Sequence, residues 1–131
     1  MKILFVEDDH NISIIAKLVF VNTSHDVILS PSPSCAIKAL DVDDFDVIIL
    51  DMTFPIGSGE DVLSYMVENN IDIPVFIHSG YVTKYEAIIK YYTEMGIIKK
   101  VYHKSMATIG EIIEDINSLT NSWFLISFDN Y

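Results

Sequence analysis

The sequence predicts a doubly wound α/β domain in which a five-stranded parallel sheet is covered by five helices. Apolar runs of strand length alternate with segments of helical periodicity up to Leu119, and this alternation is typical of repeated strand–helix–strand units. Residues 3–6, 47–50 and 75–77 are apolar throughout, as expected for parallel strands that are buried on both faces. The chain has 131 residues, which fits one domain.

Each element has its own local signal. In the first helix, apolar side chains recur at helical spacing from Ile12 to Phe20. Ser32 and Pro33 provide a cap and a first position for the second helix, and Gly96 is a natural stop for the fourth. The predicted strands are 3–6, 26–30, 47–50, 75–78 and 101–103, and the predicted helices are 12–20, 33–40, 59–69, 83–95 and 107–119.

The last residues fit no element of this scheme. We assign 1–121 to the folded domain and 122–131 to an apolar C-terminal tail, which is rich in aromatic residues and lacks a helical period. Exposed to water, such a segment would form a large apolar patch of a kind that monomers rarely carry. We therefore expect the tail to pack on this chain or on a second copy, which makes a homodimer one expected assembly.

Composition narrows the class of protein. The net charge is −11, and the 8 basic residues are all lysines, which argues against a nucleic-acid-binding surface. Cys35 has no second cysteine with which to form an internal disulfide. The sequence contains no apolar stretch of membrane-spanning length and no signal-peptide core, so we expect a cytoplasmic protein without a membrane partner.

Reactive side chains follow four of the apolar runs. Glu7 and Asp8 follow the first, Asp51 follows the third, and Ser79 and Lys104 end the last two. Since ligands gather beyond the carboxyl ends of parallel strands, these groups should meet at one edge of the sheet. Three carboxylates and one ammonium sum to −3 + 1 = −2. This charge suits a divalent, oxygen-preferring cation such as Mg²⁺, in a site that accepts a phosphoryl group.

Taken singly, each of these residues also has an ordinary structural interpretation. Asp51 fits a loop or a helix cap, Ser79 fits a turn, and Lys104 fits a solvated surface position. Asp9 is a candidate cap for the first helix. The two neighbouring histidines, His78 and His103, are read as structural, because strand alternation points them away from the face that their neighbours occupy.

In combination and in this order, the residues resemble the receiver domain of two-component response regulators, in its single-domain, chemotaxis-regulator-like form. The resemblance covers residues 2–119, so the receiver domain would occupy 1–121. Glu7 and Asp8 match the acidic pair of the family, and Asp51 matches its phospho-acceptor. Ser79 matches the Thr/Ser position and Lys104 matches the lysine. The family also implies a flavodoxin-like strand order.

The resemblance further implies a mechanism. Asp8 and Asp51 would bind Mg²⁺ directly, Glu7 would act mainly through water, and the backbone carbonyl of Thr53 would be a further ligand. Asp51 would take a phosphoryl group from a sensor histidine kinase or phosphotransfer protein, assisted by Lys104, and Ser79 would then report the change to a downstream effector protein. Such a domain catalyses its own phosphorylation and dephosphorylation but is not a turnover enzyme.

The sequence departs from the family pattern in three places, all in the part of the domain that would pass the signal to a partner protein. Ser105 replaces the usual proline after the lysine, Val101 stands at the usual switch aromatic, and Tyr102 should point to the opposite face. Ser79 and Lys104 are 104 − 79 = 25 positions apart, with the extra residues expected in the fourth helix and at 96–98. We nevertheless predict a cis Lys104–Ser105 bond, because Lys104 must still reach Asp51.

Two other functions remain open. A receiver-like interaction module would bind its partner whether or not Asp51 is phosphorylated, and the departures at positions 101 and 105 favour that alternative. A phosphatase with an aspartate nucleophile would usually carry a second acid two residues later, where this chain has Thr53.

Overall fold

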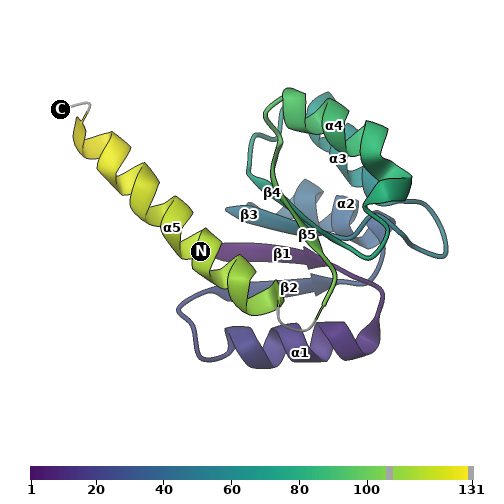
Figure 1. The fold of residues 1–131 in the computed structure, drawn as a ribbon, viewed down its shortest axis with the longest axis horizontal. Helices are drawn as coiled ribbons and strands as arrows, with labels where there is room; N and C mark the ends of the chain where they lie inside the picture. Colours follow the sequence, from purple (N-terminus) through teal and green to yellow (C-terminus); the bar gives the residue numbers. More distant parts are fainter. Residues whose placement is uncertain (106–107, 130–131) are drawn as a thin grey trace.

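The computed structural model describes the backbone of residues 1–105 and 108–129 and, within these, side chains up to Ser118. Five strands form one parallel sheet with helices on both faces (Figure 1). The strands are β1 (Lys2–Val6), β2 (Asp26–Ser30), β3 (Val47–Leu50), β4 (Val75–Ser79) and β5 (Ile98–His103), in the order β2-β1-β3-β4-β5. The predicted fold class and strand order are confirmed.

Five α-helices connect or follow the strands. They are α1 (His10–Phe20), α2 (Pro33–Val42), α3 (Gly59–Glu68), α4 (Glu86–Glu94), which follows the 3₁₀ turn η1 (Thr83–Tyr85), and α5 (Thr108–Asp129). Asp9 caps α1 and Ser32 caps α2 through side-chain oxygens that accept backbone N–H bonds, as predicted. Gly96 has φ +83° just beyond α4, which fits its predicted role as a helix stop. Among the described residues, no helix is long and apolar enough to span a bilayer.

The C-terminal segment differs from the sequence prediction. Helix α5 does not end near Leu119 but continues to Asp129, so residues 122–129 belong to an element after all. In the sequence, Leu119, Trp123 and Ile126 continue the helical spacing of Ile112 and Ile116, and no glycine or proline after Gly110 would stop the helix. The predicted start at Ala107 and the packing of the tail's side chains lie outside what the structure describes, so the packing stays a prediction.

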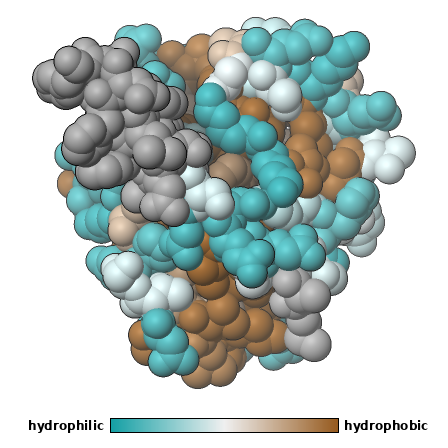
Figure 2. Space-filling view, turned by 60° about the vertical axis from the view of Figure 1, so that its left-hand side comes forward, coloured by the Kyte–Doolittle hydropathy of each residue, from teal (hydrophilic) through white to brown (hydrophobic). Residues whose placement is uncertain are grey.

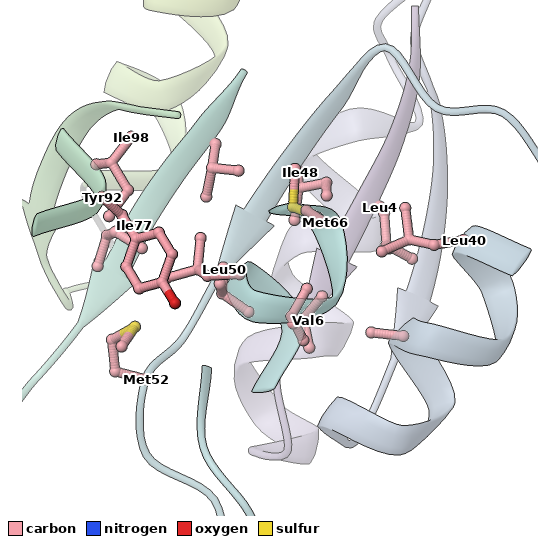
Figure 3. Packing of buried hydrophobic residues seen from close by; sticks show 14 of the residues in the cluster. Leu4, Val6, Leu40, Ile48, Leu50, Met52, Met66, Ile77, Tyr92 and Ile98 are labelled. Atoms are coloured by element: carbon pink, nitrogen blue, oxygen red, sulfur yellow. The ribbon is translucent and has the colours of Figure 1, made fainter. Parts of the chain in front are cut away.

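The two faces of the sheet carry separate apolar cores. Helices α2, α3 and α4 cover one face, where Leu40, Met66 and Tyr92 form one apolar cluster with strand residues such as Leu4, Ile48 and Ile77 (Figure 3). Helices α1 and α5 cover the other face. Because both faces are covered, the central strands β1, β3 and β4 are apolar over most of their length, and their polar side chains stand at or near the strand ends.

Strand β5 begins earlier than predicted. It starts at Ile98 rather than Val101, and its pairing with β4 is interrupted by a bulge, because Val75 lies opposite Ile98 while Phe76 lies opposite Lys100. Lys99 is therefore the extra residue on the β5 side. Part of the extra length between Ser79 and Lys104 thus lies inside the strand, and not in a loop at 96–98 as expected.

Candidate functional site

The parallel register brings the ends of four strands together. Val6 of β1 pairs with Leu50 of β3, so Glu7 and Asp51 follow side by side, and the N–H of Asp51 donates to the carbonyl of Val6. Ser79 is the last residue of β4. The N–H of Lys104 donates to its carbonyl, with a nitrogen–oxygen distance of 3.0 Å. Glu7, Asp51, Ser79 and Lys104 therefore meet at the carboxyl edge of the sheet, as predicted.

Lys104 joins two of the acidic residues. Its Nζ lies 2.6 Å from Oε1 of Glu7 and 2.8 Å from Oδ2 of Asp51. The predicted cis bond after Lys104 is wrong, because the described residues contain no cis peptide. Pairing of β5 with Ser79 directs the lysine toward the site through a trans backbone.

The acidic cluster has the donor set of a divalent-cation site. One carboxylate oxygen from each of Glu7, Asp8 and Asp51 lies within 4.8 Å of the others. Glu7 and Asp51 are 2% and 4% exposed, whereas Asp8 is exposed. With Lys104 the four groups have a formal charge of −3 + 1 = −2 when all are ionised, and hard oxygen ligands with this excess charge fit Mg²⁺. Asp9 does not join the cluster because its carboxylate caps α1.

Burial sets the protonation of this cluster. Desolvation raises the pKa of Glu7 from 4.5 to about 7; the Lys104 hydrogen bond opposes the rise, and the Asp51 charge adds to it. For Lys104, desolvation by itself would lower the pKa, but the hydrogen bonds to Asp51 and Glu7 outweigh it and raise that pKa. The lysine therefore stays charged, while Glu7 holds a proton readily when no cation is bound.

The loop after β3 holds the Asp51 carboxylate in place. Oδ1 of Asp51 accepts an N–H bond from Met52 at 2.7 Å and a longer one from Thr53 at 3.4 Å. At Gly59, an added Cβ would lie 2.5 Å from the carbonyl oxygen of Asp51 and 2.7 Å from Sδ of Met52. Only glycine permits this close approach of α3 to the backbone of Asp51 and the side chain of Met52.

A cleft of about 410 Å³ opens beside Asp51 and gives a ligand access to its carboxylate. It is lined by Asp8, Asp9, Asp51, Thr53, Phe54, Pro55, Gly80, Tyr81 and Lys104. Ser79 does not line this cleft; it is fully buried next to the lining residue Gly80, and its Oγ accepts an N–H bond from Tyr81. A larger groove of about 610 Å³ between α2 and α3 contains none of the predicted site residues.

Sequence reasoning missed two neighbours of the site. The hydroxyl of Tyr85 in η1 lies 3.4 Å from Oγ1 of Thr53. The hydroxyl of Thr108 at the start of α5 lies 2.8 Å from Nε2 of His78. No local motif marks either residue, because each contact joins positions about thirty residues apart in the chain.

Comparison with known proteins identifies the family. Residues 3–111 match the family model described as the response regulator receiver domain. This chain belongs to that family. Among curated proteins, none matches this receiver domain significantly. Solved structures do match, and they share its fold.

Three of these structures illustrate the likeness. The receiver domain of Francisella response regulator 1452 has a TM-score of 0.77 at 24% identity, over 92% of this chain and 97% of the other. TrrA of Thermotoga maritima, solved in complex with Mg²⁺-BeF, has a TM-score of 0.75 at 21% identity, over 90% and 97%. The phosphorylated cyanobacterial phytochrome response regulator RcpA has a TM-score of 0.70 at 20% identity, over 88% and 89%.

Proposed function

We propose that this receiver domain accepts a phosphoryl group on the carboxylate of Asp51. The donor is a phosphohistidine of a sensor kinase or phosphotransfer protein. One observation carries the proposal: a buried carboxylate at the end of β3 lies against the Lys104 ammonium, beside two further acids, in the floor of an open cleft. An Asp51 oxygen forms a bond to phosphorus while the phosphorus–nitrogen bond breaks, and the electron pair leaves with the imidazole.

The neighbouring residues have distinct roles in this transfer. Lys104 remains charged and neutralises negative charge that develops on the transferring oxygens, a form of electrostatic stabilisation. The Ser79 hydroxyl, which is buried at the end of β4, is the group that turns toward a phosphoryl oxygen afterwards. Thr53 and Tyr81 line the cleft and limit the approach of water to the phosphorylated acid.

A divalent cation belongs to the proposed chemistry. Glu7, Asp8, Asp51 and the backbone carbonyl of Thr53 would hold Mg²⁺, with Glu7 acting mainly through water. When bound, the ion supplies positive charge opposite the phosphoryl oxygens. The acidic cluster supports this assignment, and so does the likeness to TrrA, which was solved with Mg²⁺-BeF.

The outer face of α1 offers a docking surface for the donor protein. Ile14, Leu18 and Val21 recur at helical spacing and are exposed. Figure 2 shows brown, hydrophobic surface at the bottom of the molecule, where Figure 1 places α1. Since Asp9 both caps α1 and lines the cleft, a partner on this helix reaches toward Asp51. An exposed apolar stripe of this kind is typical of a protein-binding surface.

Incubation with acetyl phosphate and Mg²⁺, followed by intact-mass measurement, tests the proposal. We expect one added phosphoryl group on the wild type, and none on Asp51→Asn or in excess chelator. Phosphorylation that persists in Asp51→Asn would contradict the assignment. Binding of a candidate effector before and after phosphorylation then separates this function from a module whose binding ignores Asp51.

A further inference from the structure

We propose that the buried His78 and the half-buried Thr108 form a hydrogen-bonded clamp that positions Lys104 for phosphoryl transfer, at the place where Ser105 stands instead of proline. Neither residue touches the transferring group, so both are positioning residues. The functional consequence rests on the proposed phosphorylation of Asp51, whereas the structural part of the clamp is independent of it.

The Thr108 hydroxyl is the centre of the clamp. Its Oγ1 lies 2.6 Å from the carbonyl oxygen of Ser105, 3.3 Å from the Ser105 nitrogen and 2.8 Å from Nε2 of His78. A hydroxyl has one hydrogen to donate and two lone pairs that accept. All three contacts are satisfied at once if the hydroxyl donates to the carbonyl and accepts from the Ser105 N–H and from a protonated Nε2. The network therefore assigns the Nε2–H tautomer to His78.

His78 is unusual in its surroundings. It is 1% exposed within an otherwise apolar stretch of β4, and its ring lies near that of Phe5, with centroids 6.3 Å apart. Within the described part of the chain, its Nδ1 has no hydrogen-bond partner. Burial lowers the pKa of His78, so the ring is neutral. An apolar residue would fill the position without this unpaired atom, and what the imidazole adds is the bond to Thr108.

Two consecutive residues of β4 thereby hold Lys104 from both sides. The carbonyl oxygen of Ser79 accepts the N–H bond of Lys104 itself. His78 acts through Thr108, whose hydroxyl bonds both the backbone N–H and the backbone carbonyl of Ser105. The peptide units before and after the Lys104 Cα are each hydrogen-bonded. With the backbone fixed, the ammonium reaches Glu7 and Asp51 together.

Small errors in the position of such a group are costly. A misplacement of about 1 Å costs on the order of a hundredfold in rate. Lys104 acts at the end of a long flexible side chain, so its aim depends on the backbone from which it starts. The clamp fixes the backbone at Lys104 through side-chain hydrogen bonds, in a chain that lacks the family's proline at the next position.

A matched pair of variants tests the clamp. Thr108→Val removes the hydroxyl at nearly constant shape, while Thr108→Ser keeps it. We expect Thr108→Val to lower the rate of phosphorylation by acetyl phosphate on the order of tenfold or more, and Thr108→Ser to stay within about twofold of wild type. In a Lys104→Met background the valine substitution should add no further loss, because the residue through which it acts is gone.

Crystal structures of the metal-free wild type and Thr108→Val give a readout that needs no phosphorylation. We expect the Lys104 ammonium to leave salt-bridge distance of Asp51 in the valine variant. The clamp is refuted if the lysine keeps its place, if Val and Ser react equally fast, or if valine is equally harmful without Lys104. If the wild type accepts no phosphoryl group, the proposed function fails, and the crystal structures still decide whether the clamp exists.

Discussion

Tyr102 of β5 donates a hydrogen bond from its hydroxyl to the carboxylate of Asp115 in α5. The same carboxylate oxygen lies 2.7 Å from Nζ of Lys100. The tyrosine ring is buried edge-on against Phe76, with centroids 6.1 Å apart. Tyr102 thus connects α5 to the sheet. It lies on the face opposite to Val101, as strand alternation predicts, and therefore does not replace the family's switch aromatic.

The first prediction concerns this contact. Tyr102→Phe removes the hydroxyl but keeps the ring, and we expect it to lower the free energy of unfolding by about 1 kcal/mol. Tyr91→Phe, at an exposed position of α4, is the matched control and should change little. Urea unfolding monitored by circular dichroism measures both. Equal stability of the two variants would show that the bond to Asp115 contributes nothing.

The second prediction is that Mg²⁺ stabilises the fold. The acidic cluster carries a formal −2 with Lys104 included, so a divalent cation relieves repulsion in the folded state only. At a hundred times its dissociation constant, a ligand adds about 2.7 kcal/mol. The unfolding midpoint should therefore rise between chelator and saturating Mg²⁺, and Asp8→Asn should blunt the rise. A midpoint unmoved by Mg²⁺ in the wild type would refute the cation site.

The third prediction is a pH dependence caused by Glu7. Its pKa in the folded state is raised from 4.5 to about 7, so the folded protein binds more protons than the unfolded chain between these values. The stability that this provides is fully present below about pH 4.5 and is lost as the pH rises through about 7. In metal-free protein, Glu7→Gln should flatten this part of the profile. A slope unchanged in the variant would assign the titration to another group.

The fourth prediction compares two glycines. Gly59→Ala places a Cβ 2.5 Å from the Asp51 carbonyl oxygen, and we expect a loss of about 1–3 kcal/mol from overpacking, together with slower phosphorylation. At Gly110 in α5 an added Cβ meets nothing within 4 Å, so Gly110→Ala should gain about 0.5–1 kcal/mol. Thermal unfolding and intact mass report the two effects. A harmless alanine at position 59 would mean that the loop after Asp51 is free to shift.

Features encoded by short stretches of sequence were predictable. Buried parallel strands read as apolar runs, and the caps at Asp9 and Ser32 precede their helices directly. Because parallel strands end at the same edge, the position of Asp51 and Lys104 in the chain was enough to predict their meeting in space. The receiver fold and the composition of its acidic cluster follow from these local signals.

Features that depend on distant contacts were not predictable. The bond between His78 and Thr108 joins two elements 30 positions apart, and it has no motif. The start of β5 was missed because Lys99 and Lys100 interrupt the apolar pattern, and only pairing with β4 reveals that they lie in a strand. The peptide bond after Lys104 is trans for a related reason. Pairing of β5 with β4 directs Lys104 toward the site, so the cis bond expected from the family is not needed.

The bulge at Lys99 also determines how this side of the sheet can be approached. Strand β5 is an edge strand, and a flat edge with free N–H and C=O groups invites another chain to extend the sheet. Here the extra residue breaks the regular spacing of those groups and two consecutive lysines are exposed. Strand addition, including the kind that leads to aggregation, is therefore disfavoured at β5, and a partner arriving there must recognise side chains rather than backbone.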